Sequence, residues 1–254
     1  MANLALSYDD NGATGCPAYV FIHGWTCDRS FFAPQYEYFG RTNRAVAVDL
    51  RGHGDSPIAS DGDYSIDAFA GDVAALIESL GLGRSVVIGH SLGGVITCAL
   101  AATRPDLVAC AVMVDPAPLV MPDALRTVLT EIFTAISGPD GEAARAGLVE
   151  NMFMASDDAD RRAAIAKSMT STPHEIAAPA IGGVLDFDGA AALAAVACPI
   201  AAINSDGPIN DTAAMKKLNP RFMVSQTLGS GHFNQLEVPD QVNAMIEQFV
   251  RISA

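Results

Sequence analysis

A short segment, SVVIGHSLGG at Ser85–Gly94, constrains the fold of this chain more than any other part of its sequence. An apolar run of strand length ends at Gly89, a serine stands at position 91, and a second apolar run, Val95–Ala102, has the length of a helix. In a strand-to-helix turn tight enough to raise a serine hydroxyl above a sheet, a Cβ two residues before or after the serine would collide. Gly89 and Gly93 occupy those two places. The segment therefore predicts a nucleophile elbow with Ser91 at its tip, because the flanking strand and helix make a chance glycine pattern the weaker explanation.

Strands and helices alternate on both sides of this elbow. A short strand is expected at Leu4–Tyr8, with a turn at Asp9–Gly12 after it. Further apolar runs of strand length are Ala18–Gly24, Arg44–Leu50, Val108–Val114, Pro199–Asn204 and Phe222–Leu228, and helical spacing marks Asp67–Leu80 and Pro239–Ile252. This alternation predicts an α/β fold, with a mostly parallel central sheet flanked by helices.

The pattern changes in the middle of the chain. From Leu119 to Ala195, alanine, methionine and charged residues recur at helical spacing, broken by glycine and proline, with no clear strand. Because strands precede and follow this segment, we interpret residues 119–195 as a helical cap inserted in the core. Residues 1–118 and 196–254 would then form one core domain.

Three glycine-rich turns each follow a predicted strand: HGW at 23–25, RGHGDS at 51–56 and GHSLGG at 89–94. The carboxyl ends of parallel strands meet at one edge of a sheet, and open α/β sheets place their sites at that edge. The three turns are therefore expected to surround a single site.

These turns, in this order and followed by GSGHFNQLEVPDQ at 229–241, resemble the α/β-hydrolase superfamily over nearly the whole chain. A serine hydroxyl is a weak nucleophile that needs a base, and the base needs a third group to orient it. The resemblance implies that His232 is the base of Ser91. It also implies that the backbone N–H groups of Trp25 and Leu92 form the oxyanion hole.

The acid that orients His232 has two candidates in the sequence. The family's usual position follows the penultimate strand, where this chain reads INSDGPIND, and Asp206 and Asp211 are displaced from the expected place. Asp115 ends the strand after the elbow helix, in VMVDPAP, which is the position of the acid in some branches of the family. An aspartate before a proline is also an ordinary turn residue. We favour Asp115 and keep Asp206 as the alternative.

The remaining histidines have simpler explanations. His23 and His53 lie in turns where a ring can hydrogen-bond the backbone, and His90 should face away from a hydroxyl raised at Ser91. We interpret all three as structural. His174 falls in the predicted cap and is expected to be solvated.

The first hypothesis for the function is a serine hydrolase of a carboxylic ester or lactone, working through Ser91, His232 and Asp115 and an acyl-enzyme. Methionine and phenylalanine in the cap suggest a small hydrophobic ester, lactone or aromatic substrate. A cofactor-free dioxygenase or a C–C bond hydrolase on the same residues is the first alternative. A ligand-sensing protein of this fold with slow turnover is the second.

The net charge, the first residues and the cysteines limit the partners, the location and the metal sites that we expect for this chain. A net charge of −14 argues against nucleic-acid binding, which needs a basic surface. The first residues, MANLALSYDDNG, lack the basic start and apolar core of a signal peptide, and no apolar run has the length of a membrane helix. We therefore expect a cytoplasmic protein. The five cysteines are odd in number and form no C-x-x-C pair, so no disulfide and no zinc site are expected. The proposed hydrolysis calls for no cofactor and no other metal.

Overall fold

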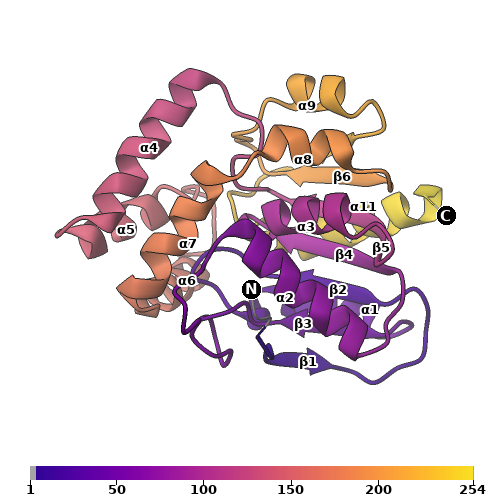
Figure 1. Cartoon of the computed structure of the whole chain (residues 1–254). Coiled ribbons are helices and arrows are strands. Elements are labelled where there is room, and N and C mark those ends of the chain that lie inside the picture. Colours follow the sequence, from indigo (N-terminus) through magenta and orange to yellow (C-terminus); the bar gives the residue numbers. More distant parts are fainter. Residues whose placement is uncertain (1–3, 254) are drawn as a thin grey trace.

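The computed structural model describes residues 4–253, in which seven strands form one sheet in the order β1-β3-β2-β4-β5-β6-β7 (Figure 1). The first strand runs antiparallel to β3, and all the other neighbours in the sheet run parallel. The strands are β1 (Tyr8–Asp10), β2 (Tyr19–Ile22), β3 (Ala45–Val48), β4 (Ser85–His90), β5 (Val108–Val114), β6 (Ile200–Asn204) and β7 (Met223–Gln226). The predicted α/β fold with a mostly parallel sheet is confirmed.

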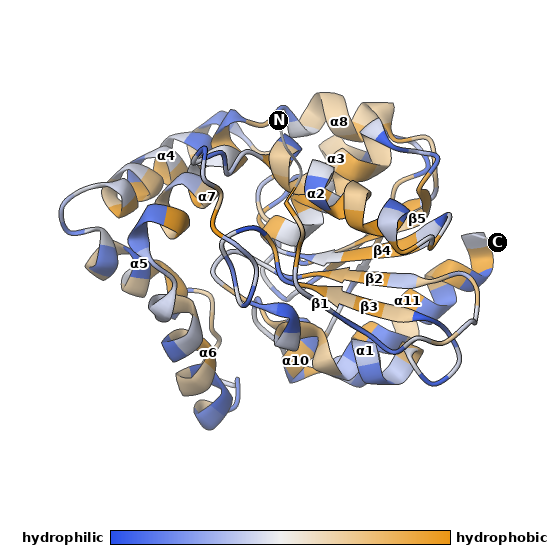
Figure 2. Cartoon of the chain, turned by 60° about the horizontal axis from the view of Figure 1, so that its bottom comes forward, coloured by the Kyte–Doolittle hydropathy of each residue, from blue (hydrophilic) through white to orange (hydrophobic). Residues whose placement is uncertain are grey.

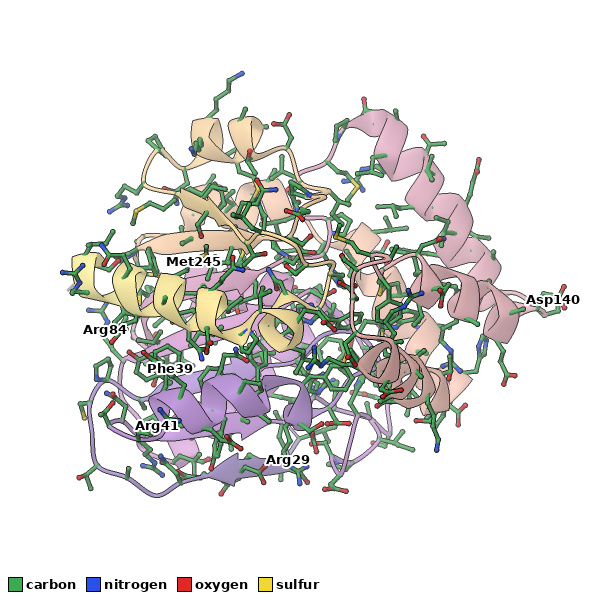
Figure 3. The ribbon with its side chains drawn as sticks, turned by 180° about the vertical axis from the view of Figure 1, so that it is seen from behind. Arg29, Phe39, Arg41, Arg84, Asp140 and Met245 are labelled. Atoms are coloured by element: carbon green, nitrogen blue, oxygen red, sulfur yellow. The ribbon has the colours of Figure 1, made fainter. Side chains whose placement is uncertain are left out.

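The central strands read as continuous apolar runs because both faces of the sheet are covered. Every residue of β2, β3 and β4 is buried. On one face lie α2 (Ile66–Ser79) and α3 (Leu92–Thr103), and on the other α1 (Ala33–Phe39) and α11 (Pro239–Ser253). Figure 3 shows α1 and α11 crossing the second face, with the labelled Phe39 and Met245 on them. Two hydrophobic cores result, one on each side of the sheet.

The expected strand at Leu4–Tyr8 was wrong in its position. The N-terminal strand is β1, Tyr8–Asp10, and its first residue pairs with Val48 of β3. Two polar contacts explain the shift: the Leu4 N–H donates to Asp72 Oδ1 (2.7 Å), and the Asp10 carboxylate binds Arg44 (2.7 Å). The apolar residues that precede the strand pack instead against the core on the face of the sheet covered by α2 and α3.

Five helices separate β5 from β6. They are α4 (Asp123–Ser137), α5 (Gly141–Glu150), α6 (Ala159–Ser171), α7 (His174–Asp186) and α8 (Gly189–Ala195). The first four stand beside the end of the sheet (Figures 1 and 2), and Asp140, labelled in Figure 3, lies at their outer tip. The last one, α8, packs against α3. The division of the chain into a core and a cap at residues 119–195 stays a prediction.

Three further helices are short. They are a 3₁₀ helix at Arg29–Phe32 between β2 and α1, α9 (Thr212–Leu218) between β6 and β7, and α10 (Asn234–Glu237) between β7 and α11. Within residues 4–253, no single helix is long and apolar enough to cross a membrane, although α7 and α8 reach that length and composition together as a pair bent by 65°. The cytoplasmic location stays a prediction.

Candidate active site

Ser91 lies between β4 and α3 in a backbone conformation that side chains rarely adopt, with φ 53° and ψ −117°. The two flanking glycines are required by space. A Cβ on Gly89 would lie 2.0 Å from the Gly93 carbonyl oxygen, and a Cβ on Gly93 would lie 2.2 Å from that of Ile22. The local geometry is therefore that of a strained strand-to-helix elbow, as the sequence motif predicts.

His232 is hydrogen-bonded to Asp115, across the carboxyl ends of the sheet. The distance between His232 Nδ1 and Asp115 Oδ2 is 2.6 Å, and Asp115 Oδ1 accepts a hydrogen bond of 2.8 Å from the Ser205 N–H. Burial raises the pKa of Asp115, but the hydrogen bond and charge of His232, with the Ser205 contact, outweigh burial and hold the pKa below its usual value. Asp115 is thus an ionised acceptor that fixes one tautomer of His232.

The alternative acid, Asp206, makes a different contact. It is exposed, and its Oδ2 accepts a hydrogen bond of 3.0 Å from the Gly229 N–H. Asp211 caps α9 by accepting from the Ala214 N–H (2.9 Å). The structure therefore brings Asp115, and neither of the other two aspartates, to the imidazole.

Ser91, Asp115 and His232 all line one cavity of about 300 Å³. Its remaining walls are largely apolar and come from the helices after β5 and from the loop after β6; they include Leu129, Phe133, Leu148, Ile181, Val184 and Ile209. Within the described residues, neither lysine nor arginine lines this cavity. The cavity lies at the low end of the size range of small-molecule sites and offers an apolar surface next to a serine, a histidine and a carboxylate.

A second hollow, of about 420 Å³, lies between α2, α3 and the junction of α7 with α8. Its ionisable lining is Asp67, Asp186 and Asp188, and its Ser65 hydroxyl already caps α2. It brings together no nucleophile and base, so the site of interest is the cavity at Ser91.

The HGW turn packs directly against the elbow. A Cβ on Gly24 would lie 3.1 Å from the Cβ of Ser91, and Thr26 has a positive φ of 55°. In the part of the chain that the structure describes, the N–H groups of Trp25 and Leu92 have no hydrogen-bond partner. Both amides are therefore free to bind an acceptor, which is the requirement for an oxyanion hole.

The Trp25 side chain has a separate role. It is 2% exposed, and its indole Nε1 donates to the Ala177 carbonyl oxygen at 2.7 Å. Since Ala177 belongs to α7, this hydrogen bond joins α7 to the HGW turn that follows β2.

His23 and His53 are buried and hydrogen-bonded to the backbone, as expected from their turns. His23 Nδ1 donates to the Gly24 carbonyl oxygen (2.8 Å), and His53 Nδ1 donates to that of Arg51 (2.9 Å). Burial lowers the pKa of His23 to about 4 and that of His53 to about 3. Both rings are therefore neutral at physiological pH.

His90 does more than the sequence indicates. Its Nε2 donates to the main-chain carbonyl oxygen of His232 at 2.8 Å, so the residue before the elbow serine holds the loop that carries the base. The sequence predicts only a ring turned away from the Ser91 hydroxyl. Two further contacts of that loop, with Met152 and Asp157, also escape sequence reasoning, because no motif marks either residue.

Residues 4–253 contain no cluster of three or more histidine, cysteine or acidic side chains that could hold a metal ion. The five cysteines are free thiols, and only Cys16 is exposed.

Comparison with known proteins shows the family and the fold. A family model described as "Alpha/beta hydrolase family" matches residues 19–245. Among curated proteins, an sn-1-specific diacylglycerol lipase from Mus musculus is 42% identical over 120 residues, which are 46% of this chain and 38% of the lipase. The chain thus spans well under half the length of that relative.

Two solved structures share the fold over nearly the whole chain. An esterase from Thermogutta terrifontis is 24% identical, with a TM-score of 0.82, and the match covers 98% of this chain and 93% of the esterase. An enol-lactonase from Burkholderia xenovorans is 20% identical, with a TM-score of 0.83 and coverage of 97% and 96%. At these identities the likeness concerns the fold alone.

Proposed function

The chain belongs to the alpha/beta hydrolase family, and we propose that it is a serine hydrolase that cleaves a carboxylic ester or a lactone. One observation carries the proposal: Ser91, on a strained elbow, shares a cavity with a histidine whose Nδ1 is bonded to a buried aspartate. Nucleophile, base and orienting acid are the three parts of a hydrolytic triad. The esterase, lipase and lactonase activities named for similar proteins support the same reaction class.

In the proposed mechanism, His232 Nε2 removes the proton of the Ser91 hydroxyl as its oxygen attacks the substrate carbonyl carbon. Asp115 keeps Nδ1 protonated and stabilises the imidazolium that forms. The negative charge on the carbonyl oxygen is held by the N–H groups of Trp25 and Leu92. His232 then returns the proton to the departing alcohol oxygen, which leaves an acyl group bound to Ser91.

Water completes the reaction. His232 takes a proton from the water that attacks the acyl carbon, and gives it back to the Ser91 oxygen as the acid is released. Both half-reactions use the same three side chains and the same two amides. The reaction needs no oxidant or reductant, because the only co-substrate of hydrolysis is water.

The cavity suggests the chemical class of the substrate. Its apolar walls and the lack of lysine or arginine among its described lining favour a small, uncharged, hydrophobic ester or lactone. Residues 119–195 would form the cap over this substrate, since Phe133, Leu148 and Ile181 of that segment line the cavity.

Labelling with a fluorophosphonate, followed by peptide mapping, tests the nucleophile. The expected result is a single modified residue, Ser91, and no labelling of the Ser91→Ala protein. A panel of p-nitrophenyl esters and lactones of increasing acyl length then tests the reaction, and rapid multiple turnover is expected for short neutral acyl groups.

Three other results would contradict the proposal. Oxygen consumption with an aromatic substrate would indicate a dioxygenase, and cleavage of a diketone without ester turnover would indicate a C–C bond hydrolase. Tight ligand binding with only a single slow turnover would indicate a sensor.

A further inference from the structure

The main chain of His232 is held by the helical segment that follows β5. The His232 N–H donates to the Met152 carbonyl oxygen at 3.1 Å. The neighbouring Gly231 N–H donates to Asp157 Oδ1 at 3.3 Å. Residues 152–157, here called the bridging segment, lie between α5 and α6. The two consecutive amides that precede the imidazole are thus bonded to a part of the chain remote from it in sequence.

Asp157 is the centre of this contact. It is 7% exposed, and its second oxygen, Oδ2, accepts a hydrogen bond of 2.8 Å from the Met154 N–H. Among the described residues, no cationic side chain forms an ion pair with this carboxylate. A buried carboxylate is costly unless it is hydrogen-bonded. Here its two oxygens are bonded to one amide on each side, and they join the bridging segment to the loop of His232.

The contact leaves no spare space. A Cβ on Gly231 would lie 2.8 Å from Asp157 Oδ2, 3.0 Å from the Met152 carbonyl oxygen and 3.2 Å from the Met154 nitrogen. Two residues further on, the Phe233 ring stacks on the Phe153 ring, with centroids 5.3 Å apart and planes 29° apart. A glycine at 231 is therefore what allows the two backbones to approach.

The same bridging segment forms a wall of the cavity. Met152, Phe153 and Met154 all line it, beside Ser91 and His232. A ligand that fills the cavity would therefore contact a segment whose backbone is also hydrogen-bonded to the loop that carries the His232 imidazole.

We propose that Asp157 is a positioning residue, which holds the bridging segment against the loop of His232 and so couples the substrate-facing wall to the base. The inference rests on the proposed function, in which His232 acts on the Ser91 hydroxyl. Proton transfer between side chains requires the base to lie within hydrogen-bond reach, and a displacement of about 1 Å can cost about 100-fold in rate. Asp157 acts through the position of His232 and does not contact the reacting atoms.

The test is a double-mutant cycle on the full chain with Asp157→Ala, Gly231→Ala and the two combined, assayed with p-nitrophenyl acetate. Each single change should lower kcat by roughly 10- to 100-fold, because the base is displaced, and should change KM less, because the walls at Phe133, Leu148 and Ile181 are not part of the contact. The combined variant should be no slower than the slower single variant, since both changes break one contact. Asp160→Ala, at an exposed position in the first turn of α6, is the matched control and should keep wild-type kcat.

A second readout separates positioning from stability. The rate of Ser91 labelling by a fluorophosphonate should fall in parallel with kcat, at a temperature well below the unfolding midpoint of each variant. Asp157→Asn keeps the shape and one acceptor, so it should lie between wild type and Asp157→Ala; if the alanine variant does not fold, the asparagine variant takes its place in the cycle.

Two outcomes would overturn the inference: wild-type kcat and labelling in folded Asp157→Ala or Asp157→Asn, or single effects that simply multiply in the combined variant. Failure of the proposed function looks different. In that case the wild-type protein itself shows neither ester turnover nor labelling at Ser91, and the inference falls with it.

Discussion

The imidazole of His90 and the main chain of His232 are joined by a hydrogen bond of 2.8 Å, from Nε2 to the carbonyl oxygen, and their rings lie 4.7 Å apart between centroids. Burial, with a smaller effect of the nearby His232, lowers the pKa of His90 to about 3. The ring is therefore a neutral donor at physiological pH. His90, next to the proposed nucleophile Ser91, thus holds the main chain of His232, the proposed base.

Replacing His90 tests this support. In His90→Gln the side-chain amide can donate near the position of Nε2, whereas His90→Met has a similar length and no donor. We expect the glutamine variant to keep kcat within about tenfold of wild type and the methionine variant to lose roughly 100-fold, because an unheld loop misplaces the base. Steady-state kinetics at one pH measures both, and equal kcat values in two folded variants would refute the prediction.

The acid can be identified by paired asparagine substitutions. Asp115→Asn should fold and lose about 10⁴-fold in kcat, because an amide no longer selects the Nδ1-protonated tautomer of His232. Asp206→Asn should change kcat by less than about threefold, since its carboxylate bonds only the exposed Gly229 amide. The comparison is made by ester hydrolysis under identical conditions, and the reverse order of activity would make Asp206 the acid.

The elbow predicts a large difference between two glycine-to-alanine changes. Gly93→Ala should destabilise the protein by about 3 kcal/mol or more, because its Cβ would lie 2.2 Å from the Ile22 carbonyl oxygen. Gly147→Ala lies in α5 with no atom near the added Cβ, and should stabilise by roughly 0.5–1 kcal/mol. Urea unfolding followed by circular dichroism measures both. Equal midpoints would show that the turn relaxes more easily than its geometry indicates.

The three buried histidines predict a loss of stability in mild acid. Their pKa values are about 4, 3 and 3 in the folded protein, for His23, His53 and His90, against an ordinary value near 6.5. The unfolded chain therefore binds more protons below pH 6.5, and the free energy of unfolding falls as the pH drops from about 6.5 towards 4. Each histidine contributes at most about 1.4 kcal/mol per pH unit in that window.

Urea unfolding between pH 7 and pH 5 checks this slope. His53→Asn, whose amide can still donate to the Arg51 carbonyl oxygen, should reduce the slope by about one third. Gly147→Ala removes no ionisable group and should leave it unchanged. A flat profile in the wild type would contradict neutral burial of these rings.

Much of the fold could be predicted because buried parallel strands have a simple sequence signature. Runs such as Val108–Val114 are apolar on both faces, and β5 has those bounds. The position of β1 could not be predicted in this way, because a three-residue edge strand is fixed by polar contacts such as the one between Asp10 and Arg44. Such contacts depend on which strand is the neighbour.

The candidate site was predictable where a steric requirement selects the residue type. Glycine at 89 and 93 follows from the turn itself, so Ser91 could be singled out at once. The sequence favoured Asp115 as the acid but left Asp206 as an alternative, since both follow strands that end at the same edge. The contacts of Met152 and Asp157 were invisible, because a carbonyl oxygen or a lone aspartate carries no pattern. The catalytic roles themselves stay predictions.

Because Asp115, the proposed acid, lies at the end of β5, the turn after β6 contributes no side chain to the proposed triad. Ser205 donates its backbone amide to Asp115, and the Asn210 side chain accepts hydrogen bonds from the backbone N–H groups of Leu119 and Val120. Residues 206–209 are exposed, yet Gly207 and Ile209 line the cavity. New residues at positions 207–209 could therefore reshape the cavity without replacing Ser91, Asp115 or His232, so this turn is a place at which the binding preference of the cavity could be varied.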